Sequence, residues 1–160
     1  MRSTPIDFHK DERGRYHSIL HRSDGVLIRL EGGSYNRIGG ADPRVPHDIA
    51  HLVVEHAFGL DAGLWGTLAA GGLVQNATFA GGRKPPHAEK RAWAITDRAG
   101  ETLRQAELLV RAVADAMLEG SGRNLRPDAF ERASAGLRAA AARWQALGGD
   151  DTLRLTWPPA

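Results

Sequence analysis

The strongest constraint on the fold is the order of hydrophobic patterns, because strand-type patterns lie toward both ends of the chain and helical patterns lie between them. An Asp24-Gly25 pair separates two runs of β-forming residues, which predicts a β-hairpin over residues 15–31. Residues 152–157 alternate between apolar and polar types and predict a final strand. Apolar residues recur every three or four positions over 87–119 and 127–147, which predicts two or three helices. This segregation favours an α+β fold, in which the C-terminal strand rejoins the N-terminal sheet.

Proline and glycine residues mark the ends of the predicted elements. Pro46 begins a helix that continues to about Phe58 and ends at Gly59, a residue type that favours helix termination. Residues 35–38 predict a short third strand, and residues 59–86 predict a glycine-rich loop with one helical turn near 64–70. We therefore expect a single domain over residues 1–160. It consists of a small antiparallel sheet packed on the 46–58 helix and the later helices.

The composition narrows the class of protein. The chain has no cysteine, which excludes disulfides and cysteine-ligated metal sites. It has no apolar run long enough to span a bilayer, and residues 1–10 do not resemble a signal peptide, so we expect a cytoplasmic protein with no membrane partner.

The formal net charge is only +2, and the arginines of residues 91–111 alternate with Glu101, Glu107 and Asp115. That alternation is typical of a solvated helix face, so we expect no nucleic-acid partner. Nothing in the sequence predicts the oligomeric state.

The helix predicted over residues 46–58 carries the chemically distinctive side chains. His47, His51 and Glu55 are spaced four apart and therefore lie along one face of the helix. The opposite face is apolar, so we expect the helix to be buried. Buried polar groups need hydrogen-bond partners or ligands, which makes this face the candidate functional site.

Two histidines at this spacing can chelate one divalent metal ion. Glu55 lies about 12 Å along the helix axis from His47, so we assign it to the second ring N–H of His51 rather than to the ion. A third ligand must come from another element; His87 is the first choice, and Asp97 and Glu101 are further candidates.

The same helix supplies two candidate catalytic carboxylates. Asp48 or Glu55 would position or deprotonate a water molecule beside the metal ion. Asp48 also has a purely structural interpretation, because an acidic residue in the first turn interacts favourably with the helix dipole.

The pattern formed by His47, Asp48 and His51 resembles the H-E-x-x-H active-site helix of zincin metallopeptidases, and the preceding hairpin resembles the strands that lead into that helix. The resemblance implies a metal-dependent hydrolase. Asp48 departs from the family pattern, which has a water-activating glutamate at this position, and no motif here matches the family's third ligand.

A second resemblance covers most of the chain. The segments Pro46-His47-Asp48-x-x-His51-x-x-x-Glu55, Gly63-x-Trp65-Gly66 and Leu153-x-Leu155-x-Trp157-Pro158 are similar to a family of small uncharacterised bacterial proteins, largely actinobacterial. This resemblance implies no particular activity.

Three functions stay open at this point. The first is a metal-dependent enzyme, a hydrolase of a small molecule or peptide, with zinc as the first choice of metal and iron or manganese as alternatives. The second is a metal-free acid–base enzyme or a small-ligand-binding protein that uses the same helix. The third is a non-catalytic scaffold or partner-binding protein in which the histidines form a structural hydrogen-bond network.

Overall fold

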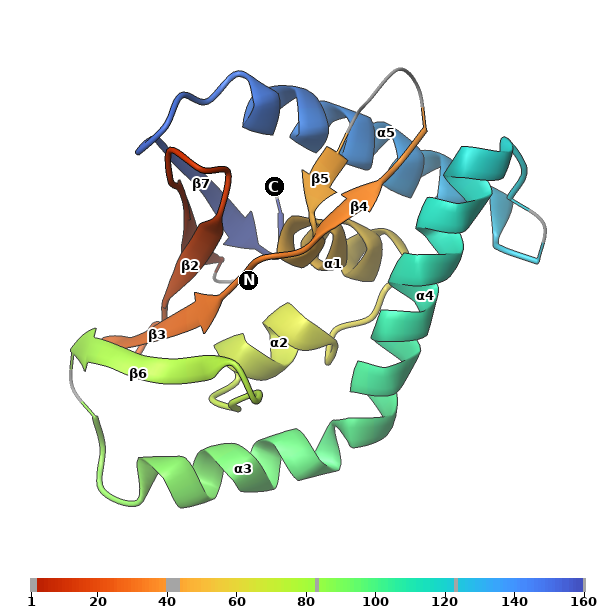
Figure 1. The fold of residues 1–160 in the computed structure, drawn as a ribbon. Helices are drawn as coiled ribbons and strands as arrows, with labels where there is room; N and C mark the ends of the chain where they lie inside the picture. The colour runs from red at the N-terminus through yellow and green to blue at the C-terminus, as the bar shows by residue number, and fades with distance from the viewer. Residues whose placement is uncertain (1–2, 40–43, 83, 123, 160) are drawn as a thin grey trace.

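The computed structural model describes residues 3–39, 44–82, 84–122 and 124–159, and it shows an α+β fold (Figure 1). Five antiparallel strands form one sheet in the order β6-β3-β2-β1-β7. Their bounds are β1 Thr4–Lys10, β2 Tyr16–His21, β3 Val26–Glu31, β6 Ala77–Gly82 and β7 Thr152–Trp157. The predicted hairpin and the return of the C-terminal strand to the N-terminal sheet are both confirmed.

Alternation of apolar residues gives the sheet one buried face. Ile6 and Phe8 of β1 are fully buried, and they lie opposite Leu155 and Leu153 of β7. The same period of two continues across β2 and β3. The helices cover this buried face, so the core lies between the sheet and the helical layer.

The helices are α1 His47–Ala57, α2 Leu64–Ala69, α3 Ala88–Arg98, α4 Gly100–Glu119 and α5 Pro127–Gln145. Helix α1 lies at the centre of the molecule and packs against both α4 and α5 (Figure 1). It ends as the sequence predicts, because Gly59 adopts φ +72°, a left-handed conformation that favours glycine. The helical stretch predicted over residues 87–119 forms two helices, because α3 ends at Arg98 and α4 begins at Gly100. In the described part of the chain, no helix is both long and apolar enough to cross a membrane.

Three strands lie where the sequence predicts none: β1, β6 and β5 Arg44–Pro46. Strand β1 pairs between β2 and β7, and its inward-facing Ile6 and Phe8 alternate with polar residues. Strand β6 lies in the stretch predicted as a loop. Its backbone pairs with the edge of β3, and Ala77 is the only one of its residues that is buried. The predicted third strand exists as β4 Tyr35–Arg37, but it pairs with β5 Arg44–Pro46 in a separate two-stranded sheet.

Candidate metal centre

The polar face of α1 is turned toward α4, and this contact forms the candidate site. His51 is 4% exposed and Glu55 is fully buried, whereas His47 is partly exposed. Glu107 of α4 reaches across from the neighbouring helix, with about half of its side chain exposed. The site is therefore buried on the α1 side and open to solvent on the α4 side.

Three potential ligand atoms converge at this contact. The Nε2 atoms of His47 and His51 are 3.2 Å apart. Oε2 of Glu107 lies 2.9 Å from Nε2 of His51 and 3.4 Å from Nε2 of His47. Ligand atoms bound at about 2.1 Å to one ion are separated by about 3.0 Å along an octahedral edge and about 3.4 Å along a tetrahedral edge. The triangle has the dimensions of one face of a coordination shell, so His47, His51 and Glu107 can hold a metal ion.

The other ring nitrogens of both histidines have acceptors. Nδ1 of His47 lies 2.7 Å from Oδ1 of Asn36 on β4, and Nδ1 of His51 lies 2.7 Å from Oε2 of Glu55. When each Nδ1–H donates to its acceptor, each Nε2 has a free lone pair, and the two Nε2 atoms are 3.2 Å apart. This arrangement is the one that metal-binding histidines generally show.

Glu55 fixes His51 and also joins α1 to α2. Its Oε2 accepts a hydrogen bond from the backbone N–H of Leu64 at 2.8 Å, and its Oε1 accepts one from that of Trp65 at 3.2 Å. These two N–H groups belong to the first turn of α2, which has no side-chain cap of its own. The contact with Nδ1 of His51 confirms the predicted pairing of these two residues. Glu55 is therefore a positioning residue, and its carboxylate does not line the cavity beside the histidines.

Burial and the neighbouring charged groups set the pKa values of the two histidines. Burial alone lowers the pKa of His51, but its hydrogen bonds with Glu107 and Glu55 outweigh burial and raise the pKa to about 9. The same hydrogen bond with His51 lowers the pKa of Glu107 to about 2. Burial and the neighbouring His51 lower the pKa of His47. Without a metal ion, this raised pKa favours the imidazolium form of His51 between two carboxylates, and a bound cation would take the place of its proton.

Asp48 lies beside the histidines and lacks a partner for one carboxylate oxygen. The residue is 7% exposed, and its Oδ2 accepts no hydrogen bond from any described residue. Burial raises its pKa to about 6. Asp48 and the three potential ligands line a cavity of about 300 Å³, whose other walls include the apolar side chains of Leu30, Leu64, Val74 and Leu103.

The structure places the remaining predicted residues away from this cluster. His87 is exposed and precedes α3, where it adopts φ +57°, and it is not part of the metal-binding group. Asp97 and Glu101 lie near the junction of α3 and α4 and do not belong to the group either. His56, on the other side of α1, is exposed.

Glu107 is the site residue that sequence reasoning assigned to the solvated face. It lies four residues after Leu103, which packs at the same cavity, so helical spacing places both on one face of α4. Only the packing of α4 against α1 shows that this face meets the histidines.

Comparison of the chain with protein-family models, curated proteins and solved structures finds no match. The interpretation of the site therefore depends on its geometry and chemistry.

Proposed function

We propose that this protein is a metal-dependent hydrolase that holds one divalent metal ion between α1 and α4. The observation that carries the proposal is the convergence of Nε2 of His47, Nε2 of His51 and the carboxylate of Glu107, with both Nδ1 atoms already held by oxygen acceptors. Two imidazoles and one carboxylate form a ligand set typical of catalytic zinc sites, which keep a further position for water or substrate.

Zinc is our first choice of metal, with iron and manganese as alternatives. The donor set contains nitrogen and carboxylate oxygen but no sulfur, which suits all three metals. A bound zinc ion would supply Lewis acidity and lower the pKa of a coordinated water. The exposed side of Glu107 gives that water and a substrate access from solvent.

In this proposal the two carboxylates of α1 have different roles. Asp48 is the catalytic base, because its unpartnered Oδ2 belongs to a residue that lines the cavity next to the ligands. Glu55 is the positioning residue, because every hydrogen bond that its carboxylate accepts comes from His51 or from the start of α2. A hydrogen bond from Nδ1–H of His51 to a carboxylate also makes the imidazole a better metal ligand.

The cavity favours a small substrate with an apolar portion. At about 300 Å³ it is at the lower end of ligand-binding cavities, and aliphatic side chains from β3, α2 and α4 form much of its wall. Gln75 and Asn76 provide amide groups at its edge, which suits the carbonyl of an ester or amide bond. We therefore favour a small ester, amide or short peptide as the substrate class.

Measuring the metal content tests whether His47, His51 and Glu107 bind a metal ion. We would measure metals in tag-free protein by elemental analysis and titrate the metal-free protein with zinc. Glu107→Gln is the informative variant, because Glu107 is half exposed and its loss leaves the buried Glu55–His51 pair intact. We expect near-stoichiometric zinc in the wild type and at least about tenfold weaker binding in the variant.

Glu119→Gln is the matched control, because Glu119 lies on the same helix, is exposed and is not part of the group. It should bind zinc as the wild type does. Absence of binding in the wild type after loading with zinc, iron and manganese, in well-folded protein, would refute the metal site.

The Asp48→Asn variant tests whether Asp48 is the base in the proposed hydrolysis. Hydrolysis of a panel of small chromogenic esters and amides by the zinc-loaded protein should fall by about 100-fold or more in this variant, while zinc binding persists. Activity that survives this substitution would remove Asp48 as the base. Activity that persists in metal-free protein would contradict the metal-dependent mechanism.

One observation favours a metal-free alternative. Glu55, His51 and Glu107 already form a hydrogen-bonded chain, with distances of 2.7 Å and 2.9 Å on either side of the imidazole. Such a chain can hold and transfer a proton, and it can equally act as a structural network. Activity resistant to exhaustive chelation would support the catalytic version.

A further inference from the structure

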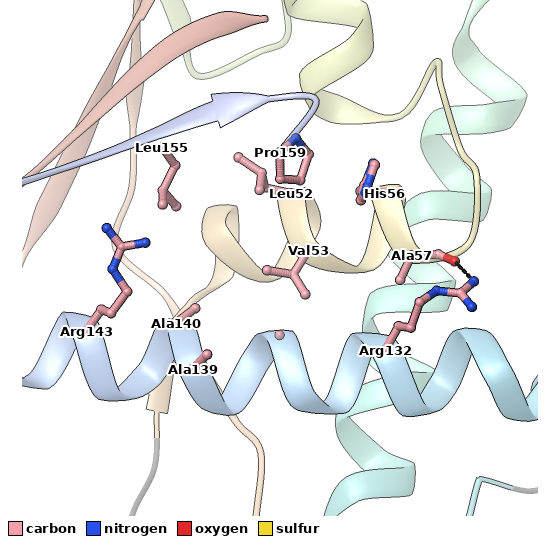
Figure 2. Close-up of a pocket in the computed structure, with 11 residues that line it drawn as sticks. Leu52, Val53, His56, Ala57, Arg132, Ala139, Ala140, Arg143, Leu155 and Pro159 are labelled. Atoms are coloured by element: carbon pink, nitrogen blue, oxygen red, sulfur yellow. Dashed lines mark hydrogen bonds between the residues drawn. The ribbon is translucent and has the colours of Figure 1, made fainter.

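A second concave site lies on the face of α1 opposite the metal-binding residues. It is a groove of about 310 Å³ between α1, α5 and the end of β7, and we call it the α1–α5 groove (Figure 2). Its α1 residues include Leu52, Val53 and His56. These positions project roughly opposite to His47 and His51 on the helix, so the two sites are separate.

The groove is hollow because the facing residues of α5 are small. Gly136, Ala139 and Ala140 face Val53, and a Cβ atom at Gly136 would lie only 2.8 Å from Cγ1 of Val53. The helices therefore approach closely at Gly136, and the groove opens beside this contact. Leucine and proline side chains from β7 and the residues after it, Leu155 and Pro159, close the other side.

The polar groups of the groove are all basic. His56, Arg132 and Arg143 line it, and no acidic residue does so in the part of the chain that is described. Arg132 already has partners, because it donates to the carbonyl oxygen of Ala57 at 3.1 Å and pairs with Asp128 at 3.4 Å.

Arg143 differs from Arg132 in that no hydrogen bond or ion pair to another described residue involves its side chain. Its side chain rises from α5 beside Leu155, at the end of the groove opposite Arg132 (Figure 2). A free guanidinium next to an aliphatic surface is complementary to a carboxylate joined to an apolar chain.

We propose that the α1–α5 groove binds a small amphipathic carboxylate, such as a medium-chain fatty acid. The aliphatic chain lies along Leu52, Val53 and Leu155, and the carboxylate pairs with the guanidinium of Arg143. Charge complementarity selects an anion over a neutral or cationic ligand, and the limited volume selects a single aliphatic chain over a larger molecule. This site is independent of the proposed metal-dependent activity.

The test uses decanoate as the probe and isothermal titration calorimetry on the whole protein. We expect saturable binding with one site per chain, and weaker binding of hexanoate, since each methylene removed loses up to about fourfold in affinity. Arg143→Gln should weaken decanoate binding by about three- to fivefold, as expected for a solvent-exposed ion pair. Neutral 1-decanol should bind the wild type and this variant equally.

Two further variants make the result specific. Arg138→Gln removes an equal charge from the same helix but outside the groove, and it should bind decanoate as the wild type does. Ala139→Trp places a large side chain at an exposed position of the groove and should abolish binding without disturbing the core.

Binding that is absent, that does not saturate, or that is equal in the Arg143→Gln, Ala139→Trp and wild-type proteins would overturn the proposal. Glu107→Gln, which removes a proposed metal ligand, should leave decanoate binding unchanged. Failure of one site is therefore distinguishable from failure of the other.

Discussion

Replacing Glu55 with glutamine tests the central hydrogen-bond network of the protein. The glutamate is fully buried, and its two oxygens face three N–H groups, those of His51 Nδ1, Leu64 and Trp65. A glutamine of the same shape has one oxygen and one NH₂ group. Its best orientation keeps the oxygen toward His51 and Leu64 and turns the NH₂ group toward the N–H of Trp65.

This orientation leaves two buried donors facing each other and also removes the negative charge beside His51. An unsatisfied buried donor costs about 1–3 kcal/mol, so we expect Glu55→Gln to lower the free energy of unfolding by about 2–4 kcal/mol. Urea unfolding followed by fluorescence of the four tryptophans measures this change. Zinc affinity should fall by about 10- to 100-fold in the same variant, because a neutral amide oxygen is a weaker acceptor for Nδ1–H of His51 than the carboxylate is.

Glu131→Gln is the matched control, since Glu131 is exposed on α5, and it should change the free energy of unfolding by less than about 0.5 kcal/mol. An unfolding free energy for Glu55→Gln within that same range of the wild type would refute the reasoning. It would mean that the buried carboxylate is not the acceptor on which the histidine and the start of α2 depend.

The pKa of His51 is about 9 in the folded protein and 6.5 for an ordinary histidine, as in the unfolded chain. Protonation of His51 therefore stabilises the folded, metal-free protein, and this contribution is fully present below pH 6.5. This contribution of about 3 kcal/mol should disappear as pH rises through 9, which urea unfolding at a series of pH values would detect; a flat profile would contradict it. Gly66→Ala should destabilise the protein by at least about 2 kcal/mol, because the new Cβ would lie 1.6 Å from a backbone carbonyl oxygen. Gly100→Ala, which meets open space at the start of α4, should instead be neutral or stabilising in the same urea unfolding assay. Asp7 accepts two hydrogen bonds from Arg154, which lower its pKa, so Asp7→Asn should cost up to about 1 kcal/mol at pH 7. Because the pKa of Asp7 is lower in the folded protein, its carboxylate stabilises the fold only while it is ionised. The difference in unfolding free energy between Asp7→Asn and the wild type should therefore vanish as pH falls below about 4.

The fold class follows from local patterns. The hairpin turn at Asp24-Gly25, the helix between Pro46 and Gly59 and the C-terminal strand are all set by residues close in sequence. These signals are readable because turn chemistry and hydrophobic period act over a few residues. These signals do not predict strand β6, because it is an edge strand with two glycines at its end and no clear alternation of apolar residues. Its strand conformation depends on backbone pairing with β3.

Part of the candidate site also follows from local sequence, and part depends on tertiary packing. The spacing of His47, His51 and Glu55 alone places them on one helix face and pairs His51 with Glu55, which the structure confirms. The sequence does not predict the acceptor for Nδ1 of His47. This acceptor is Asn36, which lies on β4, a strand that pairs with β5 outside the main sheet.

The sequence by itself determined the α+β class, the helix that carries the histidines and the pairing within that helix, because these depend on contacts one turn or one hairpin apart. The tertiary structure decided that Glu107 completes the group and that His87 does not. A potential ligand 56 residues beyond His51 is brought close only by the packing of α4 on α1, and that packing depends on apolar surfaces contributed by the whole chain.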